Sequence, residues 1–383
     1  MKMNRLPKGE EGSIFIWSAV GLAVLIAFAA FATDIPYVYV ARHQAQTAAD
    51  AGALSGAYGL LSGPGQARAD AKAIAVRTPI IGQFLTPGQV DAFTCNSNGG
   101  AIDRCLANSA NPDQVTCITY RDVAHGNPMP LFLMPVLQLF GGGRATAGAS
   151  GWDAANVSAL ATARLSNACS GDCFKPWSIA DRWTEKSIPP NGQFDVGIDE
   201  YDPVTTGYGY PADNGLQVTL KVGSPQAALT PGFFYAVDFP PLNRGTPATG
   251  GSNYRDNIAT CGPGSFVDVG DQLQVEPGNM VGPTRLGTQA LIDLDPGAFW
   301  NGTAVAGSAF GSTSPRLIRI GFFDPRLPVV SGRTYVTVIK VGGFFIEGVV
   351  AGGDVVGYYT QVIAFGGPPD PNCAFLQTVQ LVK

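Results

Sequence analysis

The first strong feature of the hydrophobic pattern is an unbroken apolar run near the start of the chain. Residues 12–33, GSIFIWSAVGLAVLIAFAAFAT, are 22 uncharged residues between Glu11 and Asp34. An α-helix needs about 20 mostly apolar residues to cross the hydrocarbon core of a membrane. The pattern therefore predicts a transmembrane helix over residues 12–33, with the lipid bilayer as its surroundings.

A helical pattern of another kind continues through residues 34–60. Small residues recur there at the spacing i, i+3, i+4, i+7, i+8 and i+11, which places them on one helix face. Small side chains let another backbone approach closely, so we expect a stalk helix that packs against a partner helix. The alternative is that alanine is simply a good helix former. The residues of this expected helix-packing interface are Ala45, Ala48, Ala49, Gly52, Ala53 and Gly56.

Two further regions follow, an α+β unit over residues 61–165 and a β-rich domain over residues 166–383. Residues 64–80 are typical of a short helix, and VTCITY (115–120) and VSALATARL (157–165) alternate as strands do. The C-terminal region has apolar runs between turns rich in Pro, Gly, Asn and Asp, which is the pattern of a sandwich or barrel. Its candidate strands are GLQVTLKVG, GFFYAVDF, LIRIGFFD, YVTVIKVGGFFIEGVV, VVGYYTQVIAF and CAFLQTVQLV.

The predicted fold class is thus a membrane-anchored α+β protein, with an N-terminal helix followed by a mostly β extracytoplasmic region. A second apolar segment, PMPLFLMPVLQLFGGG (128–143), is too short to span a membrane. We expect it to form a helix that covers a sheet, or alternatively a hairpin at the membrane interface.

Charges on either side of the apolar run indicate its orientation. Lys2, Arg5 and Lys8 precede the run, whereas only Arg42 follows it closely. The positive-inside rule then makes residues 1–11 a cytoplasmic tail and places the rest of the chain outside the cytoplasmic membrane. The alternative is a signal peptide, cleaved after Ala29 or Ala32.

Cysteine usage is consistent with an oxidising compartment, where disulfides persist. The chain has seven cysteines, of which six could pair, although their spacing does not define the pairs. No second cysteine pair or nearby histidine supports a zinc site. The possible disulfide cysteines are Cys95, Cys105, Cys117, Cys169, Cys173, Cys261 and Cys373.

Composition argues against nucleic-acid binding and against catalysis. The net charge is −5 and only 14% of residues are charged, whereas nucleic-acid binding leaves a basic footprint. The two histidines are His43, in the stalk, and His125, in a loop. The sequence contains neither a G-x-S-x-G nucleophile elbow nor a phosphate-binding P-loop. We therefore expect no catalytic site, no cofactor and no small-molecule substrate.

The densest group of carboxylates lies in the segment FDVGIDEYDP. Calcium prefers loops that supply six to eight oxygen ligands, but the spacing here is not that of an EF-hand. We expect surface turn acids and no metal site, with calcium binding as the alternative. The four residues are Asp195, Asp199, Glu200 and Asp202.

These N-terminal features resemble the Flp (tight-adherence, Tad) pilus-assembly TadE/TadG-like family. The resemblance rests on the apolar helix and, after it, on TAADAGALSGA and on Asp34, Tyr37, Tyr39, Arg42, Gln44 and Gln46. It implies a single-pass protein of the bacterial cytoplasmic membrane whose partners are other pilus-assembly proteins or pilin-like helices. The chain lacks the D-x-S-x-S motif that some TadG proteins carry in a von Willebrand A domain. After Gly9, Ile14 and Phe15 also replace the Glu-Tyr pair of processed pilins.

Two functions are consistent with these observations. The first is a non-catalytic membrane protein of pilus assembly, anchored by its helix, with the β-rich region making partner contacts. The second is a secreted or surface β-rich adhesive protein, released by cleavage after Ala29 or Ala32.

Overall fold

In the computed structural model the chain divides into two compact units, which we describe separately. Unit 1 comprises Met1–Ala57, Gly65–Arg164 and Leu381–Lys383, and unit 2 comprises Tyr58–Pro64 and Leu165–Gln380. The structure describes residues 11–97, 105–136, 153–278, 280–330, 334–350, 352–365, 367–370, 373 and 375–382, with side chains from Phe15 onward. Residues 137–143 of the apolar segment expected at 128–143 lie outside the described residues.

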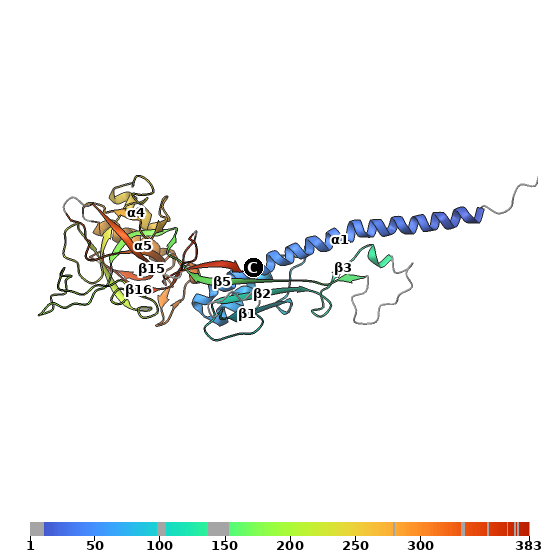
Figure 1. Cartoon of the computed structure of the whole chain (residues 1–383), viewed down its shortest axis with the longest axis horizontal. Coiled ribbons are helices and arrows are strands. Elements are labelled where there is room, and N and C mark those ends of the chain that lie inside the picture. The colour runs from blue at the N-terminus through green and yellow to red at the C-terminus, as the bar shows by residue number, and fades with distance from the viewer. Residues whose placement is uncertain are drawn as a thin grey trace, which may run out of the picture. The chain divides into compact units, whose positions relative to one another are not determined.

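Unit 1 is dominated by α1 (Glu11–Gly59), the long helix at the start of the chain (Figure 1). The expected transmembrane and stalk helices are one continuous helix of 49 residues, and Pro36 lies inside it. At a rise of 1.5 Å per residue it is about 70 Å long. This long apolar helix and the mostly β region after it confirm the α+β architecture of the predicted fold class.

Three antiparallel strands in the order β1-β2-β5, which belong to a five-stranded sheet, and a second helix complete the main part of unit 1. β2 is the central strand, and Cys117 on it pairs with Ala92 of β1 and Ala161 of β5. The elements are α2 (Pro64–Ala75), η2 (Pro87–Gln89), β1 (Val90–Cys95), β2 (Gln114–Arg121), β3 (Met129–Pro130), β4 (Ala154–Ala155) and β5 (Val157–Asn167). The helix expected at 64–80 and the strands expected at 115–120 and 157–165 are all present.

Unit 2 contains a closed ring of six strands. The ring runs β15–β14–β7–β9–β8–β16 and is closed by the pairing of β16 with β15, while β11 extends it at the start of β15. Most pairs are antiparallel, but β14–β7 and β8–β9 are parallel. The strands are β7 (Phe174–Ala180), β8 (Gln217–Gly223), β9 (Phe233–Ala236), β11 (Gln272–Gln274), β14 (Leu317–Phe323), β15 (Tyr335–Val349) and β16 (Val355–Thr360).

The remaining elements are not part of the ring. They are η1 (Leu60–Ser62), β6 (Ser170–Gly171), α4 (Gly251–Ala259), β10 (Val267–Asp268), α5 (Val281–Leu294), β12 (Phe299–Trp300), β13 (Val305–Ala306), η3 (Gly311–Thr313), β17 (Val362–Ile363) and β18 (Leu376–Val382). β17 and β18 pair in parallel, and β6 pairs with β10.

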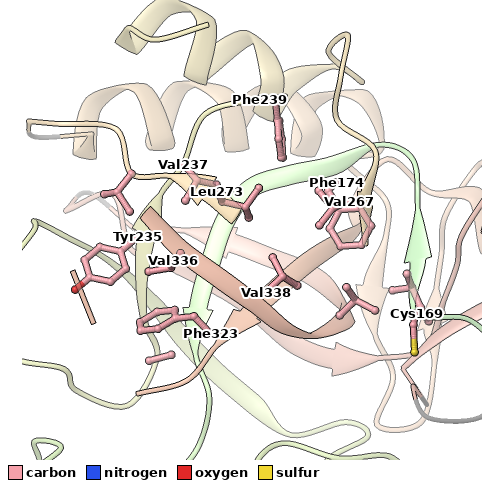
Figure 2. Close-up of a cluster of buried hydrophobic side chains, with 14 of the residues drawn as sticks. Cys169, Phe174, Tyr235, Val237, Phe239, Val267, Leu273, Phe323, Val336 and Val338 are labelled. Atoms are coloured by element: carbon pink, nitrogen blue, oxygen red, sulfur yellow. The ribbon is translucent and has the colours of Figure 1, made fainter. Parts of the chain in front are cut away.

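Two apolar clusters form the core of unit 2. The first takes buried side chains from all six strands of the ring and from both helices, including Trp177, Leu220, Phe234, Ile320 and Tyr359. The second takes the other face of β7, β9 and β15 and adds Leu273 of β11 and Val267 of β10 (Figure 2). β7 and β9 are therefore buried on both faces, whereas β8 exposes Gln217 and Lys221.

The helices α4 and α5 were not expected, because the β-rich region was predicted to hold strands and turns. α5 buries Thr284, Gly287, Thr288 and Leu291, which have helical spacing but include only one large apolar side chain. A methyl group added to Gly287 would lie 2.9 Å from the carbonyl oxygen of Arg255 in α4. The two helices thus approach through small residues, a face that a hydrophobic pattern does not reveal.

Candidate functional site

The two halves of α1 have opposite surroundings. Large apolar side chains near its start are exposed, and Phe15 exposes 77% of its surface, whereas Ala45 exposes 1%. The helix contains an 18-residue window of mean hydropathy 2.3, long and apolar enough to cross a membrane. A run of exposed large apolar residues that continues into a packed helix is expected of a membrane anchor, because lipid rather than protein would cover it.

Asp34 is the first charged residue after the apolar run. It is 1% exposed, and its carboxylate accepts backbone N–H bonds from Phe132 (3.1 Å), Leu133 (2.9 Å) and Met134 (2.7 Å). The Tyr37 ring meets the Phe132 ring edge-on at 4.9 Å. Hydrogen bonds to an ionised acceptor are among the strong ones, so Asp34 fixes the segment after β3 on α1.

The two glutamines of the motif tie α1 to the rest of unit 1. Gln44 Oε1 accepts the backbone N–H of Ile81 at 2.6 Å. Gln46 Nε2 donates to the carbonyl oxygen of Leu160 in β5 at 3.0 Å. Tyr39 and Arg42 are exposed. The structure therefore gives Asp34, Tyr37, Gln44 and Gln46 contacts within the chain.

The six small residues of α1 form a packing face, but the chain itself covers that face. All six are buried. A methyl group added to Gly52 would lie 2.6 Å from Cys117 Sγ of β2 and 2.9 Å from the carbonyl oxygen of Ala71 of α2. One added to Gly56 would lie 2.6 Å from Val115 and 3.0 Å from the carbonyl oxygen of Ala67.

The expectation that this face meets a partner helix therefore needs correction. The hydroxyl of Thr119 donates to the carbonyl oxygen of Ala45 at 3.1 Å, so β2 follows α1 in the opposite direction along the same face. The small residues are needed because α2 and β2 both approach the α1 backbone closely. Sequence spacing showed the face but could not show which element covers it.

Six of the seven cysteines form three disulfides. The pairs are Cys95–Cys105, Cys169–Cys373 and Cys173–Cys261. Cys117 is free and buried, and burial raises the pKa of its thiol to about 12. Cys117 is therefore a protonated packing residue rather than a reactive thiolate.

The acidic loop brings together a set of carboxylates different from the one expected. Oxygens of Glu185, Asp195 and Asp199 lie within 4.8 Å of one another, while Glu200 and Asp202 are not part of this group. The loop itself uses these carboxylates, since Asp199 Oδ2 accepts the N–H of Asp195 at 2.9 Å and Glu185 Oε2 accepts the N–H of Gly192 at 3.1 Å. These hydrogen bonds account for the clustering without an ion.

Asp202 has the role of a turn acid. Its Oδ1 accepts the backbone N–H groups of Val204 and Thr205, each at 2.9 Å, and these bonds lower the pKa of Asp202. The side chain of Glu200 lies 3.3 Å from Lys186 Nζ in an exposed ion pair. Both observations agree with the expected surface turn acids.

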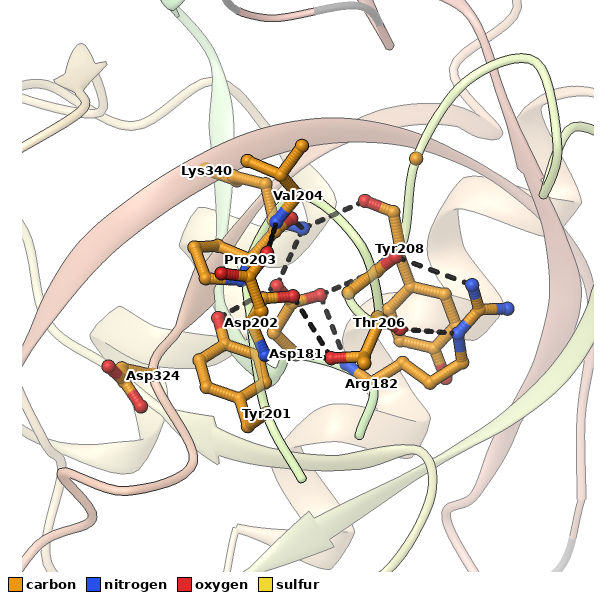
Figure 3. Close-up of polar contacts among 12 residues, drawn as sticks. Asp181, Arg182, Tyr201, Asp202, Pro203, Val204, Thr206, Tyr208, Asp324 and Lys340 are labelled. Carbon is orange, nitrogen blue, oxygen red and sulfur yellow. Dashed lines mark hydrogen bonds and ion pairs between the residues drawn. The ribbon is translucent and has the colours of Figure 1, made fainter. Parts of the chain in front are cut away.

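A buried polar network in unit 2 was missed by sequence reasoning. The Asp181 carboxylate is fully buried at the end of β7 and lies 2.6 Å from Lys340 Nζ of β15. It also accepts bonds from Tyr201 Oη (2.9 Å) and from the Tyr208 N–H (2.8 Å) (Figure 3). Burial raises the pKa of Asp181, and the opposing effect of Lys340 is smaller.

This network is structural. Lys340 Nζ also donates to the carbonyl oxygens of Pro203 (2.9 Å) and Tyr208 (2.8 Å), so its three protons are used. The network pins the loop between β7 and β8 to the ring (Figure 3). No sequence signal predicts it, because its members come from three distant segments.

Neither histidine lies in a catalytic arrangement within the described part of the chain. His43 is exposed on α1. His125 Nδ1 lies 2.7 Å from Asp122 Oδ1, and its ring stacks on that of Tyr120 at 4.0 Å. These contacts hold the loop after β2, which matches an ordinary structural role.

Comparison with known proteins gives a match in the region of α1. The Tad family model, Flp pilus-assembly TadE/G-like, matches residues 12–59. No curated protein and no solved structure matches the chain. The matched residues contain the exposed apolar half of α1, the Asp34 junction and the buried small-residue face. The match agrees with the resemblance that the sequence showed over the same part of the chain.

Proposed function

We propose that this chain is a non-catalytic, single-pass protein of Flp (Tad) pilus assembly in the bacterial cytoplasmic membrane. The observation that carries the proposal is the family match over residues 12–59. It coincides with a helix whose first half exposes large apolar side chains, among them Phe15, Trp17 and Phe28. The anchor lies in the bilayer through residues 12–33.

The charge and cysteine pattern supports an orientation with the N-terminus in the cytoplasm. Lys2, Arg5 and Lys8 would remain on the cytoplasmic side. The three disulfides would then form outside the cytoplasm, where the compartment is oxidising. The β-rich region accordingly makes extracytoplasmic partner contacts.

The small-residue face is already covered, so we assign the partner helix a different surface of α1. Ile35, Tyr39 and Val40 are exposed by 53%, 71% and 45% just beyond the apolar run. We propose that a pilin-like or assembly helix contacts this side. A photocrosslinking residue at Tyr39 should then capture a pilus-assembly protein in cells, whereas the same residue at Ala69, exposed on α2, should not. Capture from both positions, or from neither, would contradict the assignment.

Membrane anchoring is tested by expressing the full chain with a C-terminal tag in a bacterium. We expect an uncleaved chain by intact mass, retention in membranes after carbonate extraction, and loss of the tag when spheroplasts are treated with protease. A soluble product that begins at Ala30 or Thr33 would overturn the anchor and favour the secreted adhesive protein. Protection of the tag from protease would overturn the orientation.

A further inference from the structure

A pocket of about 260 Å³ in unit 2 is lined by two basic side chains, the buried Lys175 and the partly buried Arg319. Its walls include Lys175 of β7, Arg319 of β14, the hydroxyl-bearing Ser312 and the apolar side chains of Ile363 and Phe365. Lys175 and Arg319 lie on paired parallel strands, where Arg319 is in register with Phe174. The fold therefore brings two basic side chains to the wall of one small cavity.

Lys175 is buried with few partners. The residue is 5% exposed, and its ammonium group donates to the carbonyl oxygen of Thr260 at 2.9 Å. An ammonium group has three protons to donate, and no carboxylate lies within ion-pair distance of it among the described residues. Burial, together with the charge of Arg319, lowers the pKa of Lys175 to about 7.

Arg319, like Lys175, carries a positive charge that its contacts do not neutralise. Its Nε donates to the carbonyl oxygen of Ile363 at 2.6 Å, and its guanidinium lies 5.2 Å from the centre of the Phe365 ring. Asp172 raises the pKa of Arg319, but burial outweighs this effect and lowers it. In the described part of the chain, no ion pair joins Arg319 to an acid.

Two neighbouring cations in a buried site repel each other and lose hydration, and both costs fall when an anion enters. Charge-assisted hydrogen bonds to an oxyanion would use the free ammonium protons and the terminal N–H groups of the guanidinium. The apolar wall offers room for a short hydrocarbon group, and the volume lies below that of drug-sized pockets, about 300 to 1,000 Å³.

We propose that this pocket binds a small organic oxyanion, with its phosphate or carboxylate group between Lys175 and Arg319 and its short apolar body against Ile363 and Phe365. The proposal goes beyond the anchoring function and departs from the expectation that no small molecule is bound. It is independent of the partner that α1 contacts.

The test is calorimetric titration of the full chain in detergent with butyl phosphate, pentanoate and, as the uncharged control, butanol. We expect the anions to bind and butanol not to bind. The tighter anion identifies the group that the pocket prefers. Absence of binding by both anions would overturn the proposal, as would equal binding of butanol.

Two variants test whether the anion binds in this pocket. Lys175→Met should weaken anion binding at least about tenfold, which is roughly 1.4 kcal/mol. Lys221→Met is the matched control, because Lys221 is exposed on β8, and it should bind as the parent protein does. Lys175→Met should retain its fold, because it removes a buried charge that lacks a carboxylate partner. Equal binding by the parent protein and Lys175→Met would place the anion elsewhere and refute the proposal.

Proton linkage gives a test that needs no variant. At pH 8 the Lys175 amine is mostly neutral, since its pKa is about 7, and a bound anion would favour its protonated form. Titrations in two buffers with different ionisation heats should therefore show net proton uptake, and affinity should fall as pH rises from 7 to 9. Binding without proton uptake would contradict a role for Lys175.

Discussion

Asp34 and Asp238 show how differently two buried carboxylates can be accommodated. Asp34 is ionised and receives three backbone N–H bonds. Asp238 is 1% exposed, and neither of its carboxylate oxygens accepts a hydrogen bond from a described donor. Burial, reinforced by the neighbouring Glu276, raises the pKa of Asp238 to about 8. The folded protein therefore favours the protonated form of Asp238 through the neutral range.

This raised pKa makes stability depend on pH at one residue. The folded state holds the Asp238 proton between about pH 4 and pH 8 while the unfolded chain has released it, so the free energy of unfolding falls as pH rises through this window. Asp238→Asn replaces the carboxyl group with an amide that does not titrate, so this pH dependence of the free energy of unfolding disappears. We expect the variant to melt close to the parent protein at pH 5 and clearly higher at pH 8.

Thermal unfolding at the two pH values checks this prediction. Asp293→Asn is the control, because Asp293 is exposed on α5, and it should show no comparable change between pH 5 and pH 8. A stability gain for Asp238→Asn that is the same at both pH values would mean that charge on Asp238 is not the cause.

At the scale of elements, α1 combines two kinds of helix surface. Its first half needs only apolar side chains, because length and hydrophobicity suffice for a bilayer. Its second half needs small ones, because α2 and β2 lie against the backbone at Gly52 and Gly56. One uninterrupted helix thus connects the apolar residues 12–33 directly to the packed core of unit 1, without a break between residues 33 and 34.

The close approach at Gly52 predicts a penalty for the smallest possible side chain. In Gly52→Ala the new methyl group would meet the backbone of α2 and Sγ of Cys117, so α1 would have to shift. Such overpacking typically costs about 1–3 kcal/mol. We expect a lower free energy of unfolding for unit 1 in chemical denaturation.

Gly65→Ala is the matched control, because Gly65 lies in α2 and no atom lies within 4 Å of an added methyl group. That substitution should be neutral or stabilise the helix, by up to about 1 kcal/mol. If Gly52→Ala were as stable as Gly65→Ala, the tight packing of α1 on α2 and β2 would be wrong.

At the scale of the whole molecule, disulfides connect segments that are distant in the chain. Cys169–Cys373 joins residues 204 positions apart within unit 2, whereas Cys95–Cys105 in unit 1 spans 10. Closing a longer loop removes more conformational entropy from the unfolded chain. The long-range disulfide holds the segment before β7 next to the segment before β18. All six strands of the ring lie between its two cysteines in the sequence.

We therefore expect the two disulfides to differ in their contribution to stability. The pair Cys169→Ala and Cys373→Ala should lower the free energy of unfolding of unit 2 by about 2–5 kcal/mol. The pair Cys95→Ala and Cys105→Ala should have a smaller effect on unit 1. Urea titrations that follow the transition of each unit measure this, and a larger loss from the short-range pair would contradict the loop-length argument.

The local pattern of apolar and small residues predicts several of the helices and strands of this molecule. The apolar run, the small-residue face and the strands at 115–120 and 157–165 are readable from the sequence because helices and strands repeat their burial at fixed spacing. The family resemblance of residues 12–59 also follows from contiguous residues. By contrast, the buried face of α5 includes Thr284 and Gly287, and residues with low helix propensity gave no reason to expect a helix there.

What the sequence by itself determined is therefore the long apolar helix with its small-residue face and several of the strands, since these depend on residues close together in the chain. Only the tertiary structure decided what covers Gly52 and Gly56, how six cysteines pair, and that Lys175 and Arg319 share a pocket. Each of these depends on strand and helix pairings between distant segments. The parallel pairing of β7 with β14 cannot be predicted from either strand alone, because the pairing is stabilised by the ring of strands that closes around it.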